Sequence, residues 1–275
     1  MDFASKRENY LDISFIEDII NGMYDWVRVI DKDNNVLFLN EAMAEGIGSY
    51  TLGRKCYAIL GKSAPCEALG GDFLDIFNID EDHIGIYIAD VSGHGVPASM
   101  LTIFLCSAID KKSLSPSVTL EKLYRDFNDS NILNDLYITV FYAVIDLKKH
   151  EITFSNAGHN VIPILFNQNR FELLSSAGIP ISDWLPNPQY QDKSLPLHAG
   201  DKLFLYTDGA VEIRNAQSEQ FGEDRLLNTL LGNKASIDST LEDILSQISR
   251  FVGNDQFRNS YDDITMALVE LQSSS

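Results

Sequence analysis

The sequence predicts an α+β protein: a four-layer α-β-β-α sandwich in which two antiparallel sheets face each other between outer helices. Seven strand-like apolar runs and four helical patterns share residues 71–271. Neighbouring runs are often joined by turns of a few residues, such as Asp80-Glu81-Asp82, which favours antiparallel pairing over repeated βαβ units. The 275 residues are 45% hydrophobic and 10% aromatic, which is enough for a sizeable core.

The chain before residue 67 has a different pattern. Residues 14–27 carry apolar side chains at helical spacing, and residues 27–40 predict a strand pair around a polar turn. Short helical stretches and Gly53-Arg54-Lys55-Cys56-Tyr57 follow. This order resembles the opening half of a PAS sensor domain and stops before the strands that would complete one. We therefore expect a partial PAS-like region over residues 1–66; the alternative is a small α+β cap without sensory function.

The remaining elements are justified by their periodicity. Runs rich in β-branched and aromatic residues predict strands, and apolar residues recurring at three and four predict helices. The expected strands are 71–79, 83–90, 137–147, 151–158, 161–167, 201–209 and 262–271, and the expected helices are 97–112, 117–131, 222–231 and 239–253.

Composition excludes several classes of protein. Lys and Arg total 21 against 40 Asp and Glu, so the net charge is −19, which argues against nucleic acids and anionic membranes as partners. The first residues lack the apolar core of a secretory signal, and the apolar run 136–145 is too short to span a bilayer. Three cysteines without paired spacing indicate neither a disulfide framework nor a zinc knuckle. We expect a cytoplasmic protein without membrane insertion; the sequence leaves a homodimer open.

Acidic residues stand at the ends of several predicted strands, beside glycine or a second aspartate. Strand ends can bring such side chains to one rim, where clustered carboxylates need a central positive charge. Hard oxygen donors favour Mg²⁺ or Mn²⁺, and two such ions could activate water and hold a phosphoryl oxygen. These residues are Asp72 after Gly70-Gly71, Asp90 before Val91-Ser92-Gly93, Asp208 before Gly209, and Asp262 with Asp263.

Each of these acids has a simpler interpretation, because Asp-Gly is foremost a turn sequence. His94 and His159 fit hydrogen-bonding roles in glycine-rich turns. Ser92 lacks the first glycine of the nucleophile elbow Gly-x-Ser-x-Gly. Residue types and spacing alone therefore leave a metal site and ordinary turns both open.

Five ordered motifs add a resemblance. The chain is similar to the metal-dependent (PPM-type) serine/threonine phosphatases, in the bacterial branch typified by the stage II sporulation protein E phosphatase. The resemblance covers about 200 residues, and GHGVPAS and NAGHN distinguish this branch from the eukaryotic-type enzymes. The motifs are GGDFLDIF from Gly70, IADVSGHGVPASM from Ile88, TVFYAVIDLKKHEITFSNAGHN from Thr139, LFLYTDGAVEIRNAQSEQFGEDRL from Leu203, and YDDITMALVEL from Tyr261.

The resemblance implies a role for each acid. Asp90 would bridge two Mn²⁺ or Mg²⁺ ions, and the Val91 backbone carbonyl would complete the shell of one of them. Asp208 and Asp262 would be direct ligands, and Asp72 would reach a metal directly or through water. Catalysis would then depend on Asp90 and Asp208 through a metal-bound water that attacks phosphorus, with no side-chain nucleophile.

The resemblance also implies a substrate and shows one departure. Members of this branch act on phosphoserine or phosphothreonine of anti-anti-sigma (STAS-domain) proteins and often carry an N-terminal sensor. Their phosphatase domain begins with a helix and a strand before Gly-Gly-Asp, and nothing matching them lies between Cys66 and Gly70. We therefore expect a phosphatase domain over residues 67–275 without the usual lead-in segment; the alternative is a pseudophosphatase, a non-catalytic binding module in a partner-switching pathway.

Overall fold

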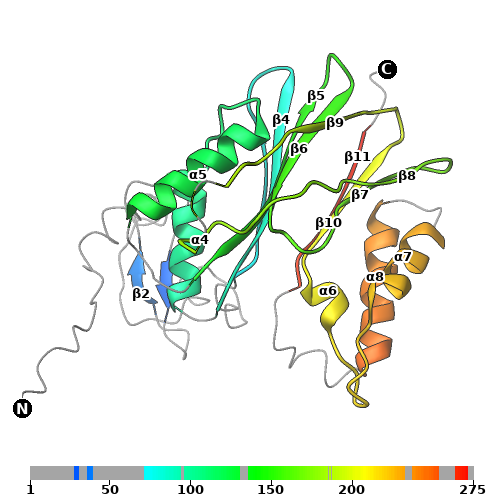
Figure 1. Cartoon of the computed structure of the whole chain (residues 1–275). Coiled ribbons are helices and arrows are strands. Elements are labelled where there is room, and N and C mark those ends of the chain that lie inside the picture. The colour runs from blue at the N-terminus through cyan, green and yellow to red at the C-terminus, as the bar shows by residue number, and fades with distance from the viewer. Residues whose placement is uncertain are drawn as a thin grey trace, which may run out of the picture. The chain divides into compact units, whose positions relative to one another are not determined.

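The computed structural model forms two compact units, one comprising Met1–Leu69 with Ile103–Ser107 and the other Gly70–Thr102 with Ala108–Ser275 (Figure 1). Most of the description concerns the second unit. The ranges that the structure describes are 28–30, 36–39, 71–93, 96–130, 136–184, 186, 188–232, 237–253 and 264–271.

The first sheet of the second unit has five strands in the order β3-β4-β5-β6-β9. All of its neighbours pair antiparallel, and β4 and β5 form the longest ladder, from His83↔Asp146 to Val91↔Ile138. The strands are β3 (Phe73–Asn78), β4 (His83–Val91), β5 (Ile138–Asp146), β6 (Glu151–Ala157) and β9 (Lys193–Pro196).

The second sheet has four strands in the order β11-β10-β7-β8, again antiparallel throughout. Its longest ladder joins β10 and β11, from Lys202↔Glu270 to Tyr206↔Met266. The strands are β7 (Ile164–Phe166), β8 (Phe171–Leu173), β10 (Lys202–Tyr206) and β11 (Met266–Glu270).

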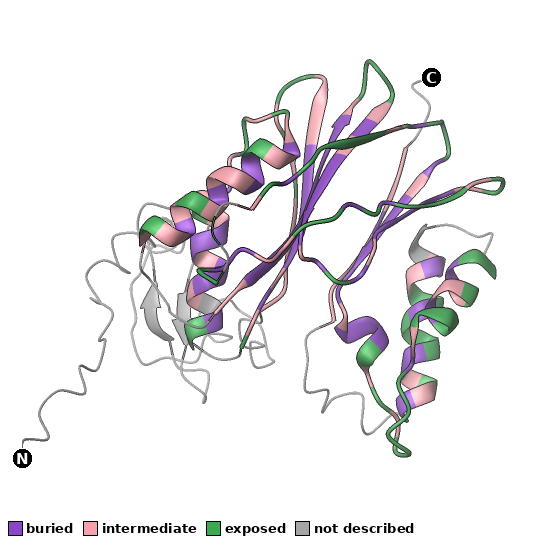
Figure 2. Ribbon diagram, in the orientation of Figure 1, coloured by how far each residue is buried: buried purple, intermediate pink, exposed green. Residues whose placement is uncertain are grey.

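The two sheets face each other across one apolar core. Because side chains alternate along a strand, every second residue of β4 and β10 points between the sheets. These inward residues belong to a single cluster that draws on both sheets, and the centre of the strands is buried in Figure 2. Members of the cluster include Ile86, Ile88, Phe141, Phe154, Leu165, Leu203 and Leu205.

Helices form the outer layers. Helix α5 (Pro116–Ser130) packs on β5 and β6, and its buried residues Leu120, Leu123 and Phe127 recur at helical spacing. On the other sheet, α8 (Ile237–Val252) packs on β11 and on α7 (Glu223–Gly232). These layers confirm the expected α-β-β-α sandwich. The remaining helices are α4 (Val96–Ala108) and the short α6 (Gly209–Glu212).

The structure corrects several of the expected elements. The strand expected at 201–209 ends at Tyr206, and the short helix α6, which was not expected, begins at Gly209. Helix α4 ends at Ala108 and not at Lys112, because the chain turns there and the Asp110 carboxylate accepts the Lys112 N–H at 3.0 Å. The sequence analysis also missed β8 and β9. These edge strands are largely exposed, so they lack the apolar alternation that marks the others.

Of the PAS-like region, the structure describes one hairpin. Strands β1 (Arg28–Ile30) and β2 (Val36–Leu39) pair antiparallel, as the sequence predicts, and form a two-stranded sheet of their own. The expected helix at 14–27 and the rest of residues 1–66 lie outside the described residues. None of the helices in the described ranges has both the length and the apolar character needed to cross a membrane.

Candidate metal centre and active site

Two of the predicted acids reach the space between the sheets by strand periodicity. On β4, Ile86 and Ile88 face the inner core, so Asp90 points to the same side at the end of the strand. Leu74 of β3 packs against the same core, which places Asp72 on the inner side as well. Since β3 and β4 run antiparallel, the beginning of one strand and the end of the other lie at the same end of the sheet.

The second sheet meets the first at this end. Leu203 and Leu205 of β10 point inward, and Thr207 continues that alternation. The Thr207 hydroxyl donates a hydrogen bond of 2.6 Å to the Asp72 carboxylate. Asp208 follows Thr207 in the chain, after the end of β10, and so lies next to a residue that contacts Asp72.

Gly71 allows the chain before β3 to approach Val91 and Asp90 closely. The backbone N–H of Val91 donates to the Gly71 carbonyl at 3.1 Å. A Cβ atom on Gly71 would lie 2.6 Å from the Val91 carbonyl oxygen and 3.6 Å from Asp90 Oδ1. A larger residue at this position would therefore force the backbone or the Val91 carbonyl to shift.

His159 connects the two sheets behind the acids. Its Nδ1 lies 3.4 Å from the Thr139 hydroxyl, which also lies 3.3 Å from the Asp90 backbone carbonyl oxygen and can donate its one proton to only one of these two acceptors at a time. Its Nε2 lies 3.1 Å from the Tyr206 carbonyl oxygen, and so would carry the proton that this carbonyl accepts. Burial lowers the pKa of His159, which favours the neutral imidazole. The structure thus places His159 as a hydrogen-bonding residue, in keeping with its sequence interpretation.

Asp208 is oriented by the turn that carries His159. Asn160 Nδ2 donates to Asp208 Oδ2 at 2.9 Å. Asp208 is the N-cap residue of α6, yet its side chain makes no capping hydrogen bond to that helix. Its backbone carbonyl receives the first helical bonds, from Val211 and Glu212. The carboxylate therefore points toward Asn160 and not along α6.

The remaining predicted ligand, Asp262, lies outside the described residues, as do Asp263 and His94. Thr265, three residues further along, pairs with Thr207: its carbonyl accepts the Thr207 N–H at 3.0 Å, and its own N–H donates to the Thr207 hydroxyl at 3.1 Å. Within the described ranges, no three His, Cys, Asp or Glu side chains are placed to hold one ion.

The donors that the structure does place fit Mg²⁺ or Mn²⁺ in kind. They are carboxylate oxygens from Asp72, Asp90 and Asp208, with the Val91 carbonyl that closely approaches Gly71. Hard divalent cations prefer such oxygen donors and fill the remaining positions with water.

Sequence reasoning missed the polar residues that hold the acids. Thr139, Thr207 and Asn160 each join two distant segments. The quoted motifs were the available sign, since TVFYAVIDLKKHEITFSNAGHN begins at Thr139 and ends at Asn160, and LFLYTDG contains Thr207. The structure gives Ser92 a structural role: its hydroxyl accepts the Tyr137 N–H at 2.8 Å.

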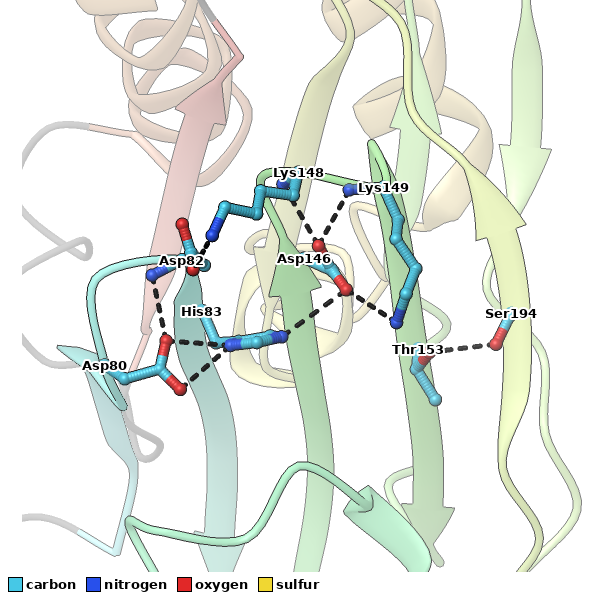
Figure 3. Close-up of polar contacts among 8 residues, drawn as sticks. All are labelled: Asp80, Asp82, His83, Asp146, Lys148, Lys149, Thr153 and Ser194. Atoms are coloured by element: carbon cyan, nitrogen blue, oxygen red, sulfur yellow. Dashed lines mark hydrogen bonds and ion pairs between the residues drawn. The ribbon is translucent and has the colours of Figure 1, made fainter.

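The opposite end of the first sheet has a different chemistry (Figure 3). His83, the first residue of β4, lies 2.8 Å from Asp80 and 3.4 Å from Asp146. The hydrogen bond with Asp80 raises the pKa of His83, while backbone and side-chain hydrogen bonds from Lys149 lower the pKa of Asp146 to about 2. Lysines accompany the acids here, so this cluster is a set of ion pairs between turns.

Comparison with known proteins decides the family. The sequence model described as Stage II sporulation protein E (SpoIIE) matches residues 80–272. The chain belongs to the SpoIIE family. That family is the one whose motifs the sequence resembles.

Two curated relatives support this membership. Protein IcfG of Synechocystis sp. is 30% identical over 234 residues, which cover 74% of this chain and 36% of IcfG. The phosphoserine phosphatase RsbU of Bacillus subtilis is 31% identical over 157 residues, covering 55% of this chain and 46% of RsbU. The matched part thus spans less than half of either relative.

Solved structures show the same fold. The SiaA-PP2C domain of Pseudomonas aeruginosa superimposes with a TM-score of 0.65 at 21% identity, covering 74% of this chain and 81% of that domain. RsbX in complex with magnesium gives a TM-score of 0.54 at 17% identity, covering 75% and 89%. These likenesses confirm the two-sheet sandwich.

Proposed function

We propose that this SpoIIE-family chain is a metal-dependent phosphoprotein phosphatase that hydrolyses phosphoserine or phosphothreonine. One observation carries the proposal: Asp72, Asp90 and Asp208 all belong to the same end of the two sheets, where Thr207 and Asn160 hydrogen-bond the carboxylates of Asp72 and Asp208 from segments far apart in sequence. Membership of the SpoIIE family and the name of RsbU as a phosphoserine phosphatase support the reaction class.

The proposed ligands are Asp72, Asp90, the Val91 carbonyl, Asp208 and Asp262, around two Mn²⁺ or Mg²⁺ ions. RsbX, which shares the fold, is described with magnesium. When bound, such ions lower the pKa of water and neutralise charge on phosphoryl oxygens.

The chain's own residues would orient that site. Thr207 holds the Asp72 carboxylate, and Asn160 holds that of Asp208. The neutral imidazole of His159, fixed between Thr139 and Tyr206, adds no positive charge behind Asp90. The apolar core between the sheets excludes water from the space behind the acids.

The proposed substrate is a phosphorylated STAS-domain protein, and the proposed division of the chain is a PAS-like region at 1–66 and a phosphatase domain at 67–275.

The rival function is a pseudophosphatase. It is favoured by one observation: among the described strands, β3 is an edge strand, and no strand preceding it in the chain pairs with it.

Phosphate release tests the proposal. With p-nitrophenyl phosphate and with phosphorylated STAS-domain proteins, we expect activity that requires added Mn²⁺ or Mg²⁺ and is lost in chelator. Asp90→Asn should reduce it by at least about 100-fold, since metal charge contributes several kcal/mol to such reactions.

Asp75→Asn is the matched control. Asp75 lies on the same sheet as Asp90 but forms an ion pair of 2.8 Å with Lys111, so this variant should keep wild-type activity. Activity in chelator would contradict the metal mechanism. Binding of the phosphoprotein without turnover, with no divalent ion detected by calorimetry, would establish the pseudophosphatase.

A further inference from the structure

An exposed aromatic pair lies beside the proposed active site. The rings of Tyr137 and Trp184 meet edge to face, with centroids 5.2 Å apart. Trp184 is 54% exposed, the highest value among the exposed large hydrophobic residues that the structure describes. A large indole kept at the surface, supported on one side by a second ring, offers a flat apolar surface to another molecule.

Tyr137 is fixed close to the acids. It lies opposite Ser92: the Tyr137 N–H donates to Ser92 Oγ at 2.8 Å, and the Ser92 N–H donates to the Tyr137 carbonyl at 3.0 Å. This pair continues the β4–β5 ladder, in which Asp90 lies opposite Thr139. Tyr137 is therefore two residues from Thr139, or about 7 Å at the rise of a strand.

Trp184 is fixed by the segment between β8 and β9. Ile181 exchanges two backbone hydrogen bonds with Ile138, at 2.8 Å and 2.9 Å. Earlier in the segment, Gly178 lies so close to the Asn156 carbonyl that a Cβ atom would be 1.7 Å from its oxygen. The segment is thus packed on β5 and on the end of β6, near the turn that carries His159, and it presents Trp184 three residues after Ile181.

We propose that the Tyr137–Trp184 pair binds an apolar side chain next to the phosphoserine of the substrate protein. This inference rests on the proposed function. Metal ions held by the proposed ligands would select a phosphoryl group but would carry no information about the sequence around it. The net charge of −19 gives the chain no general attraction for a phosphorylated, anionic partner. An apolar contact beside the site would add affinity and select a sequence.

The test uses phosphoserine heptapeptides with the full-length chain and Mn²⁺. The central residue is phosphoserine, the others are alanine, and one leucine is placed at each position in turn. For at least one position, wild type should hydrolyse the leucine peptide about five-fold or more faster, as kcat/KM, than the all-alanine peptide. The leucine should lower KM and leave kcat unchanged.

Substitutions then assign the preference to the pair. Trp184→Ala should reduce the leucine preference to about one-fold, and Trp184→Phe should retain part of it because the ring is kept. Phe171→Ala removes a comparably exposed aromatic residue on the distant edge strand β8 and should leave the preference intact. Thermal melts of each variant separate loss of folding from loss of preference.

The possible results are distinguishable. Hydrolysis by wild type without any leucine preference, or a preference that survives Trp184→Ala in a folded protein, overturns the inference and leaves the proposed function standing. If wild type hydrolyses neither the peptides nor p-nitrophenyl phosphate, the proposed function is overturned, and the inference with it.

Discussion

Thr207 on the second sheet donates a 2.6 Å hydrogen bond to Asp72 on the first, across 135 residues of sequence. The same hydroxyl accepts the backbone N–H of Thr265 at 3.1 Å. Because the oxygen accepts from one side, its proton is directed to the carboxylate. A single side chain thus joins the two sheets and fixes the orientation of Asp72.

Thr207→Val keeps the shape of this side chain and removes its hydroxyl. It leaves the Thr265 N–H without its side-chain acceptor and Asp72 without this donor, so we expect a loss of about 1–3 kcal/mol in the free energy of unfolding. Residues that orient metal ligands contribute about 10- to 100-fold in metal affinity. Calorimetric titration with Mn²⁺ should show a loss of that size.

Thr207→Ser is the control, since it keeps the hydroxyl and loses only a methyl group. Mn²⁺ affinity in the serine variant should stay close to wild type. Equal affinities in the valine variant and wild type would show that the Asp72–Thr207 bond does not orient a ligand.

Gly71→Ala tests the close approach of Gly71 to Val91. The new Cβ would lie 2.6 Å from the Val91 carbonyl oxygen, so the backbone of β4 or of residue 71 must shift. Overpacking of this kind costs about 1–3 kcal/mol, and the shift would displace the carbonyl that we propose as a ligand. Urea unfolding and Mn²⁺ titration should both show a loss.

Gly232→Ala is the matched control for that substitution. A Cβ atom on Gly232 meets nothing within 4 Å, and the residue ends helix α7, so alanine should be neutral or slightly stabilising. Similar losses of stability in both variants would show that the close approach at Gly71 is not the cause.

Much of the fold could be predicted because the pattern of each central strand reflects its own burial. Strands β4 and β5 are buried through most of their length and read as apolar runs of strand-forming residues. Strand β9 has neither property: its four residues are partly or fully exposed, and it exists because β6 offers backbone partners from Glu151 to Phe154. Such an edge strand depends on its neighbour, which a local pattern does not show.

Part of the candidate site could likewise be predicted from the sequence, and part could not. Asp72, Asp90 and Asp208 could be chosen because strand ends and adjacent glycines are local features of the sequence. The residues that hydrogen-bond these segments could not be predicted. A bond such as that between the Thr139 hydroxyl and the Asp90 backbone carbonyl, 49 residues apart, depends on the register of two strands. The ligand roles of Asp72, Asp90, Val91, Asp208 and Asp262 all stay predictions.

His83 should make stability depend on pH at the end of the sheet away from the site. Its pKa is raised in the folded state above the ordinary 6.5, chiefly by the hydrogen bond with Asp80. The stabilisation is therefore fully present below pH 6.5 and is lost as pH rises through the raised value. His83→Gln should narrow the difference between urea midpoints measured at about pH 5.5 and about pH 8.5.

Asp80→Asn tests the cause of that shift. Removal of this carboxylate should return the pKa of His83, followed by NMR titration, toward its ordinary value, while Asp146 at 3.4 Å keeps part of the shift. A wild-type His83 that titrates at or below 6.5 would contradict the ion pairs drawn in Figure 3.

Two carboxylates near Arg170 should differ strongly in their contribution to stability. Asp201 is 0% exposed, lies 3.2 Å from Arg170 Nη1, and accepts the His198 N–H at 2.9 Å and an Asn167 amide at 2.6 Å. Asp201→Ala leaves these donors without their acceptor and should cost about 3–5 kcal/mol. Glu172 is 49% exposed and 3.8 Å from Arg170 Nε, so Glu172→Ala should cost less than about 1 kcal/mol. Urea unfolding of both variants measures the difference, and equal costs would refute the buried network as the source of the stability.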